Sequence, residues 1–412
     1  MSKQNDFFLS IEQAKEKMAA AITPIQGFER LNVRHALNRI LSEDVIATFA
    51  TPPYDNSGMD GYAFRHTDAA GNSNVKLTLI GTSLAGHPFD GEVAEGQAVR
   101  IMTGAKVPSG ADTVVMQEDT EKPDENNVII HKIPAVDSNI RHIGDDLNSG
   151  ETILSKGKKL SPTDLAYLAS QGVAEVTVKR KARVAFFSTG DELRSLGEAL
   201  EEGQIYDSNR YSLYGLLTNM GLDVIDMGVI KDDRQAIENA FLDAADNADV
   251  VITSGGVSVG DADYVKETLD KLGAIDFWKI SMKPGKPLAF GLINKSLFFG
   301  LPGNPVSVIA TFYQVVQPAI QKLLGQDMQA PLIVKAKTTD FLKKRPGRTD
   351  FQRGILSNDE NGELIVKMAG TQASHILTSM SNANCFIVLD KESGNIEVGE
   401  TVNVQPFHGL ID

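Results

Sequence analysis

The sequence predicts a multidomain protein of α/β plus β class, in which a doubly wound, mostly parallel α/β domain is flanked by β-rich domains. Residues 182–325 alternate between apolar strand-like runs and helical segments, and such alternation builds right-handed βαβ units around a parallel sheet. Residues 47–147 and 329–412 instead contain short β-type segments separated by Gly, Pro and Asn. We therefore predict four domains, with bounds at 1–46 joined to 148–181 as an elongated linking domain, 47–147, 182–328, and 329–412.

The N-terminal half is predicted to mix short helices with strands. A helix is expected over 10–22, because Ser10 and Gln13 have the spacing of a capping box. A second short helical piece is expected over 33–41, and a third begins at Ser161 with Pro162 at its first position. The predicted strands between them are VKLTLIG, QAVRIMTG, TVVMQED and NVIIHKI.

The elements of the α/β domain can be placed from their apolar patterns and their end signals. The predicted strands are RVAFFS, LDVIDMGVI, DVVITSGG, PLAFGLI and SLFFGLPG, the last two paired. The predicted helices are DSNRYSLYGLLTNMG, DRQAIENAFLDAADNA, ADYVKETLDKLG and NPVSVIATFYQVVQPAIQKLLG. The last has Asn304 as its cap, Pro305 at N1 and Gly325 at its exit. Five strand-like segments follow, with Asn361-Gly362 as a hairpin signal between two of them.

Composition excludes several functional classes. The 412 residues are 42% hydrophobic and 23% charged, with a formal net charge of −14. This charge argues against a nucleic-acid or anionic-membrane partner. The sequence starts without a signal sequence and contains no apolar run of membrane-spanning length. A single cysteine, Cys385, excludes an internal disulfide and a zinc site with several thiolates, and we expect a cytoplasmic protein.

Acidic residues follow three strands of the predicted α/β domain. They are Asp191 and Glu192, Asp232 and Asp233, and Asp261 and Asp263. The carboxyl ends of parallel strands share one edge of the sheet, where ligands bind. The carboxylates could therefore surround a hard cation such as Mg²⁺. The competing interpretation is helix capping, because Asp233 and Asp261 each precede a predicted helix.

Two further segments suggest binding of anions. The loop TSGGVSVGDADY (253–264) has glycine N–H groups at a helix start, which suits an anion, although it matches neither a Walker A motif nor GxGxxG. In SMKPGKPLAF (281–290), Lys283 and Lys286 lie on a turn made stiff by prolines, which fits a phosphate or oxyanion clamp or simply a solvated turn. The basic cluster KKRPGRTDFQR (343–353) is interpreted as a solvated surface segment.

Other site chemistries find little support. The seven histidines show no HxH or HExxH spacing, which disfavours a transition-metal site. Cys385 lies in the apolar run NCFIVLD and is expected to be a buried structural thiol. The loops PPYDNSGMDGY (52–62) and RIMTGAKVPSGAD (100–112) are rich in turn-forming residues and are candidate edges of a site, or turns alone.

Eight segments together resemble one family. They are DNSGMDGYAFR, RIMTGAKVPSGADTVVMQED, STGDEL, YDSNR, TSGGVSVGDADY, KISMKPGKPLAFG, FGLPGNPVS and PGRTDFQRG. In this order they closely resemble the molybdopterin molybdenumtransferase family, which includes bacterial MoeA proteins and the C-terminal domain of gephyrin. The resemblance extends over nearly the whole chain. It implies an α/β domain of molybdopterin-binding type, a C-terminal β-barrel-like domain, and an elongated homodimer of four-domain protomers.

The resemblance also implies an activity. Family members insert molybdenum from molybdate into adenylated molybdopterin and release AMP, with Mg²⁺ assisting, at a composite site between the α/β domain of one chain and the second domain of the other. The implied partners are a second copy of the chain, the molybdopterin adenylyltransferase and other proteins of molybdenum cofactor biosynthesis.

Site residues are carried over by motif position. The residues implied as catalytic are Asp60, Thr103, Asp146, Glu192, Asp232 and Asp263, and those implied as metal ligands are Glu192, Asp232, Asp261 and Asp263. The residues implied to bind substrate are Ser254, Gly255, Gly256, Ser258, Lys279, Lys283, Lys286, Pro302, Pro305, Arg348, Arg353 and Ser374. Two departures are small: Gly58 stands where many members have alanine, and Asp145 replaces the commoner glutamate before Asp146.

Two alternatives stay open at this point. One is a molybdopterin adenylyltransferase, whose fold resembles the α/β domain, although the adjoining β-rich domains speak against it. The other is a scaffold that clusters membrane receptors, as the related domain of gephyrin does. The retained acids and lysines argue against a purely structural role.

Overall fold

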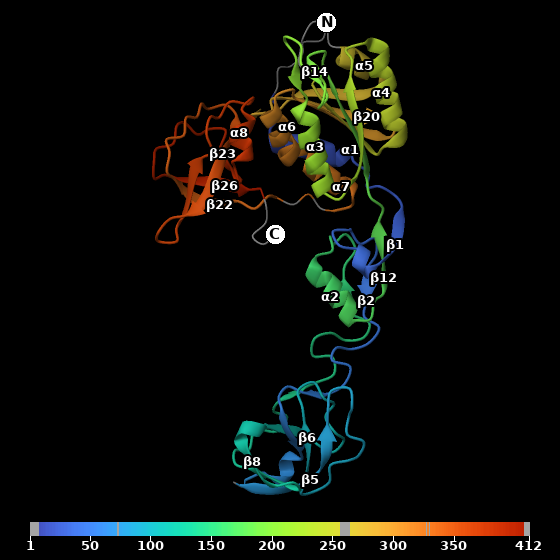
Figure 1. The fold of residues 1–412 in the computed structure, drawn as a ribbon, viewed down its shortest axis with the longest axis vertical. Helices are drawn as coiled ribbons and strands as arrows, with labels where there is room; N and C mark the ends of the chain where they lie inside the picture. The colour runs from blue at the N-terminus through green and yellow to red at the C-terminus, as the bar shows by residue number, and fades with distance from the viewer. Residues whose placement is uncertain (1–7, 72–73, 256–263, 327, 329, 408–412) are drawn as a thin grey trace. The chain divides into compact units, whose positions relative to one another are not determined.

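The computed structural model describes residues 8–71, 74–255, 264–326, 328 and 330–407. The chain forms two compact units, one from residues 1–29 and 179–412 and the other from residues 30–178. The first unit contains an α/β part and a barrel, and the second contains β-rich parts (Figure 1).

A six-stranded sheet forms the centre of the α/β part. Its order is β16 (Asp223–Ile230), β13 (Arg183–Thr189), β17 (Val250–Ser254), β21 (Ser296–Leu301), β20 (Pro287–Ile293) and β18 (Gly273–Lys279). The first four strands are parallel, whereas β20 and β18 are antiparallel to their neighbours. The sheet is thus mostly parallel, as predicted, and β18 is an additional edge strand that the sequence did not reveal.

Helices cover both faces of this sheet (Figure 1). On one face, α4 (Arg234–Asn247) and α5 (Tyr264–Leu272) bury Phe241 and Leu269 against Phe187 and Phe298 of the sheet. Burial of one such side chain contributes about 1.5–3 kcal/mol. On the other lie α3 (Ser208–Asn219), α6 (Pro305–Thr311), the π-helical turn η4 (Phe312–Val316), α7 (Gln317–Leu323) and α1 (Ile11–Ala21). The doubly wound fold is confirmed.

A closed barrel forms the C-terminal part of the first unit. Its strands run β23 (Thr349–Asn358), β24 (Leu364–Met368), β22 (Val334–Thr338), β26 (Thr401–Pro406) and β25 (Cys385–Leu389), and β25 pairs back onto β23. The short β19 (Met282–Lys283) adds to β23, and α8 (Leu377–Ser381) precedes β25. The Asn361-Gly362 hairpin is confirmed between β23 and β24.

The second unit is built on another six-stranded sheet. Its order is β7 (Thr113–Met116), β4 (Gly61–Phe64), β6 (Gln97–Ile101), β5 (Val75–Ser83), β9 (Asn127–Ile130) and β8 (Thr120–Asp124). Shorter pairs join β10 (Ile140–Arg141) to β3 (Asn56–Ser57) and β11 (Thr152–Leu154) to β2 (Val45–Ile46). The remaining elements are β1 (Phe28–Asn32), β12 (Glu175–Lys179), η1 (Val33–His35), η2 (His66–Asp68), η3 (Gln117–Asp119) and α2 (Pro162–Ser170).

In the first unit, β14 (Leu193–Arg194) pairs with β15 (Ile205–Tyr206).

The helix-end predictions have mixed outcomes. The capping boxes at Ser10 and Ser161 are both present. The predicted helix over 33–41 is wrong: only η1 is helical there, because Asn38 adopts a left-handed φ of 63° and Leu41 bonds to Lys158 O instead of continuing a helix. The helix over 304–325 is interrupted by the π-helical turn η4, and Asn304 makes no side-chain cap bond.

Candidate functional site

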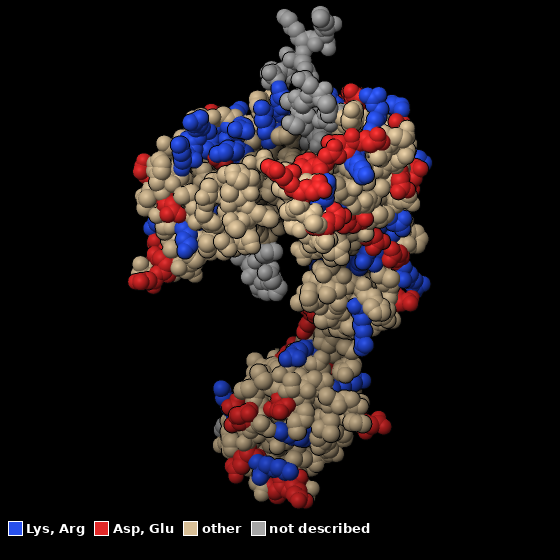
Figure 2. Space-filling view, turned by 45° about the horizontal axis from the view of Figure 1, so that its top comes forward, with Lys and Arg blue, Asp and Glu red and all other residues tan. Residues whose placement is uncertain are grey.

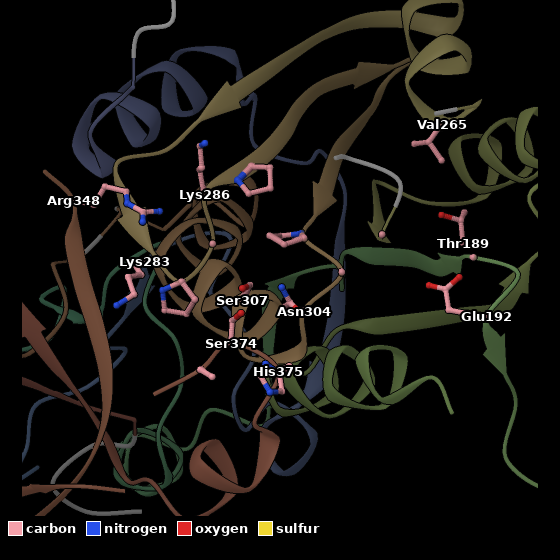
Figure 3. Close-up of a pocket in the computed structure, with 18 of the residues that line it drawn as sticks. Thr189, Glu192, Val265, Lys283, Lys286, Asn304, Ser307, Arg348, Ser374 and His375 are labelled. Atoms are coloured by element: carbon pink, nitrogen blue, oxygen red, sulfur yellow. The ribbon is translucent and has the colours of Figure 1, made fainter. Parts of the chain in front are cut away.

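A pocket of about 760 Å³ opens in the first unit at the carboxyl ends of the parallel strands, beside the barrel. It has an acidic wall on the α/β part and a basic wall opposite, with polar side chains between them (Figure 3). Its lining residues are Thr189, Gly190, Glu192, Asp232, Gly255, Tyr264, Val265, Lys283, Pro284, Gly285, Lys286, Pro287, Pro302, Gly303, Asn304, Ser307, Arg348, Gln372, Ala373, Ser374 and His375.

The acidic wall follows strands β13 and β16. Glu192 and Asp232 line the pocket, and the Asp232 N–H donates to Asp191 Oδ1 at 3.4 Å. Desolvation, followed by the charges of Asp191 and Glu192, raises the pKa of Asp232. The first two acid clusters therefore lie together, as the strand-exit argument expected. Asp233 instead caps α4, because its Oδ1 accepts the Ala236 N–H at 2.9 Å.

The basic wall comes from the proline-stiffened turn and the start of the barrel. Lys283, Lys286 and Arg348 line this side (Figure 3). Lys283 Nζ lies 3.1 Å from Oδ2 of Asp350, whose side chain is only 4% exposed, while that of Lys283 is half exposed. The ammonium of Lys286 lies over the ring of Phe8, 5.4 Å from its centroid. These contacts fix two cations opposite the carboxylates.

The floor of the pocket is formed by the GLPGN loop and the start of α6. Asn304 and Ser307 line it, and Asn304 uses its side chain there instead of capping α6 (Figure 3). Asn209 of α3 donates from Nδ2 to Gly303 O at 2.7 Å and holds the loop in place. Gly255 has a φ of 89°, and a Cβ there would lie 2.9 Å from Thr189 O, so this position requires glycine.

Arg353 stabilises the barrel side of the pocket without lining it. Its side chain is 1% exposed and donates to Thr371 O at 3.0 Å, Ala373 O at 3.1 Å and Ser379 Oγ at 3.2 Å. Burial lowers its pKa to about 10. Gln372, which lines the pocket, bonds back to the Arg353 backbone from both its amide atoms. Arg353 thus supports the loop that presents Ser374 and His375.

Other residues implied by the resemblance also lie outside the lining. Ser254 is buried and shares a hydrogen bond of 2.8 Å with Ser188. Pro305 begins α6, and Lys279 ends β18. Pro302 does line the pocket. Gly256, Ser258, Asp261 and Asp263 lie outside the residues that the structure describes.

The second unit carries the remaining implied residues. Asp60 accepts hydrogen bonds from the Thr103 N–H at 2.7 Å and from Thr103 Oγ1 at 2.8 Å. The bond from the Thr103 N–H, followed by that from its hydroxyl, lowers the pKa of Asp60. Asp146 is exposed, and its N–H donates to Thr51 O at 2.9 Å. Asp60 and Thr103 therefore form a pair, although they are distant in sequence.

Several lining residues were missed by the sequence reasoning. Thr189 and Tyr264 flank predicted strand exits, and Gln372 and His375 flank Ser374. Asn304 and Ser307 were within the GLPGNPVS motif but were given no role in binding. Their signal was their place in these motifs, since isolated polar side chains have no periodicity that would mark them.

Two carboxylates of the pocket lining are available to a cation. Within the described ranges, no group of three or more His, Cys, Asp or Glu side chains is arranged to hold a metal ion. Glu192 and Asp232 nevertheless line one pocket, where desolvation, followed by the charges of Asp191 and Glu192, raises the pKa of Asp232. A bound cation would offset these neighbouring negative charges. Mg²⁺ needs only one or two carboxylates when water and substrate phosphates complete its shell.

Comparison with known proteins gives consistent matches along the chain. Residues 9–172 match the MoeA N-terminal region (domains I and II), residues 185–322 a probable molybdopterin binding domain, and residues 335–407 the MoeA C-terminal region (domain IV). The chain is 46% identical over 404 residues to the molybdopterin molybdenumtransferase of Haemophilus influenzae, which covers 98% of this chain and 100% of that protein.

Two further similarities extend these matches. The chain is 34% identical to gephyrin of Dictyostelium discoideum over 91% of this chain and 58% of that protein. A crystal structure of the molybdopterin biosynthesis protein MoeA of Pyrococcus horikoshii superposes with a TM-score of 0.84, at 30% identity, over 97% of this chain and 100% of that one.

Proposed function

This chain belongs to the molybdopterin molybdenumtransferase family, and we propose that it transfers molybdenum from molybdate to adenylated molybdopterin with release of AMP. It is a transferase of molybdenum cofactor biosynthesis. Within the described ranges, no helix has the length and apolarity that a bilayer crossing requires. We propose that the protein works in the cytoplasm.

The observation that carries this proposal is the opposed charge of the two pocket walls. Glu192 lies on one side, and Lys283, Lys286 and Arg348 on the other (Figure 3). Asp232 lines the same pocket. A substrate that carries phosphates and reacts with an oxyanion needs cationic groups for its oxygens and carboxylates for a cation. The volume of about 760 Å³ is within the range of small-molecule sites.

The acidic wall would bind a cation, and the basic wall would bind oxyanions. Glu192 and Asp232, together with Asp261 and Asp263, would hold Mg²⁺, which when bound would offset the negative charge of phosphate and molybdate. Lys283 and Lys286 would bind the oxygens of molybdate and of the departing AMP, which lowers the cost of charge on the leaving phosphate.

The remaining groups would orient the substrates. Ser374, Asn304 and Ser307 can donate or accept hydrogen bonds at the floor of the pocket. Positioning and preorganised electrostatics would account for the reaction, and no covalent adduct with a side chain is required.

We also propose that the protein acts as a homodimer in which the Asp60–Thr103 pair and Asp146 of a second copy complete the site. Large hydrophobic side chains are exposed along residues 196–214, which supports burial against a partner. Those exposed side chains are Leu196, Leu200, Ile205, Tyr206, Tyr211 and Tyr214. Mixing Asp60→Ala and Asp232→Asn chains should restore activity, because one of the two composite sites would then be intact.

The decisive assay supplies the purified protein with adenylated molybdopterin, Mg²⁺ and molybdate. AMP release is followed together with molybdenum that stays on the pterin. We expect AMP release to depend on molybdate and molybdenum to appear on the pterin in equal amount. If AMP is released at the same rate without molybdate, or if no metal reaches the pterin, the proposed reaction is wrong.

A further inference from the structure

We propose that a second, basic pocket next to the reaction pocket is an antechamber that captures a tetrahedral dianion and passes it to the reaction pocket. This proposal rests on the proposed function in that the dianion is taken to be molybdate. The antechamber has a volume of about 550 Å³ and lies in the first unit. Its lining residues are Lys283, Phe341, Lys343, Arg345, Pro346, Arg348, Asp350, Gln352, Met368 and Gln372.

The antechamber and the reaction pocket share part of one wall. Lys283, Arg348 and Gln372 line both cavities. An anion that leaves the antechamber along this wall stays in contact with the same two cationic side chains until it reaches the reaction pocket. The transfer therefore needs no step in which the dianion lies beside uncompensated carboxylates.

The charge of the antechamber is opposite to that of the whole protein. Lys283, Lys343, Arg345 and Arg348 contribute four positive charges against the single carboxylate of Asp350. Lys283 already pairs with Asp350 at 3.1 Å, so three cations stay uncompensated within the lining. Among the described residues, no carboxylate lies within ion-pair distance of Lys343, Arg345 or Arg348. On a chain of net charge −14 such a local reversal raises the concentration of anions at one place.

Hydrogen bonds fix the backbone of the segment 343–348, which carries three of these cations. Lys344, the one basic residue of the segment that is buried, bonds through Nζ to Arg345 O at 2.9 Å, and its N–H donates to Asn395 Oδ1 at 2.9 Å. Gln352 donates to Lys343 O at 3.0 Å, and Ser281 Oγ donates to Gly347 O at 3.1 Å. These bonds hold the segment in a shape that presents its neighbours to the cavity.

The surface view agrees with this placement. Figure 2 shows Lys and Arg side chains gathered at the upper left, over the C-terminal barrel, and acidic side chains concentrated over the adjoining α/β part. The cavity is several times larger than one oxyanion, so the dianion would keep much of its hydration there. Such a site suits capture and transit rather than final binding.

The test removes charge at two positions that belong to the antechamber alone. In Lys343→Gln/Arg345→Gln, both side chains keep their approximate length but lose their charge, and Lys337→Gln is the matched control. Lys337 is an exposed barrel lysine outside both pockets, and it pairs with Glu363 at 2.6 Å. Thermal unfolding confirms that each variant is folded. The KM values for molybdate and for adenylated molybdopterin are then measured separately at low and at high ionic strength.

We expect the KM for molybdate to rise about five- to tenfold in the double variant at low ionic strength, with kcat and the KM for the pterin unchanged. The difference should shrink at high ionic strength, because salt screens exposed charges. Lys337→Gln should behave as the wild type. An unchanged KM for molybdate, or an equal rise in the KM for the pterin, would overturn the proposal. The second outcome would assign the cations to the pterin phosphate.

A binding measurement separates this proposal from the proposed reaction. Equilibrium dialysis of the protein with molybdate alone, without pterin, should show several-fold weaker binding to the double variant than to Lys337→Gln. If the wild type is inactive but this difference is found, the antechamber stands and the reaction fails. If the wild type is active and all three proteins bind and turn over molybdate equally, the reaction stands and the antechamber is refuted.

Discussion

Replacing Arg353 by methionine should destabilise the barrel and distort the pocket wall formed by residues 371–375. The guanidinium makes three hydrogen bonds, to Thr371 O, Ala373 O and Ser379 Oγ. Methionine fills a similar length but leaves the two carbonyl oxygens without a donor.

The size of the effect follows from two opposing contributions. Three hydrogen bonds from a charged donor stabilise the fold by about 1.5–3 kcal/mol each, or about 5–9 kcal/mol together. Against this, burial lowers the pKa of Arg353 to about 10. Relative to an ordinary value of 12.5, this corresponds to a cost of about 3 kcal/mol for the buried charge, which the substitution removes. We therefore expect a net loss of about 2–6 kcal/mol, a range that includes the loss typical of breaking a buried polar network.

The assay must report on the barrel alone, because a multidomain chain does not unfold in one two-state step. Hydrogen exchange of peptides that cover β23, β24 and residues 370–380 provides this local free energy of opening. Lys335→Met is the matched control, since Lys335 is exposed on the same barrel and lines neither pocket. In Arg353→Met these peptides should exchange faster, whereas peptides of the second unit should not change.

Enzyme kinetics on the same variant provide a second measurement. Because the loop presents Gln372 and Ser374 to the pocket, the KM for substrate should rise in Arg353→Met more than kcat falls. A neutral surface substitution changes stability by at most about 0.5 kcal/mol. If the local free energy of opening in Arg353→Met is within that range of the wild type, Arg353 does not support this wall.

Three further outcomes are expected. First, Gly61→Ala should prevent stable folding of the second unit, because its Cβ would lie 1.8 Å from Val115 O. Gly58→Ala, whose Cβ would lie 3.4 Å from the nearest atom, should change the free energy of unfolding by less than about 1 kcal/mol. Equal melting temperatures for the two variants would contradict this contrast. Second, the raised pKa of Asp232 means that its carboxyl group binds a proton more tightly in the folded state than in the unfolded state. Protonation of Asp232 therefore stabilises the fold below pH 3.8, and this stabilisation is lost as the pH rises through the raised pKa. Asp232→Asn should therefore raise the free energy of unfolding at pH 7 by about a few tenths of a kcal/mol, a small effect because the residue is exposed and its charge is screened by solvent. The substitution should also weaken the stabilisation by added Mg²⁺. A variant that melts at or below the wild-type temperature at pH 7, or that Mg²⁺ stabilises as strongly as the wild type, would count against that role. Third, Lys283→Ala should depress turnover at least tenfold while circular dichroism stays unchanged, with Lys335→Ala on the barrel surface as control; wild-type turnover would remove Lys283 from the proposed clamp.

The sequence by itself determined much of this protein, because the relevant signals are local. The alternation of strands and helices over 182–325 predicted the doubly wound sheet, since burial of one face of each element imposes its own periodicity. The capping boxes at Ser10 and Ser161 followed from side chains that bond within three residues of themselves.

Only the tertiary structure decided how those signals are used. Asn304 has the sequence of a helix cap, yet its side chain lines the pocket, because the GLPGN loop held by Asn209 places it there. Asn38 ends a helix that its neighbours favour, because bonds across to residues 158–160 stabilise another backbone. The composition of segment 343–348 predicts a solvated run of charges. In the structure Lys344 is buried, and residues on either side of it line a cavity. In each case the energy that decides comes from contacts between residues far apart in the chain, which no local pattern encodes.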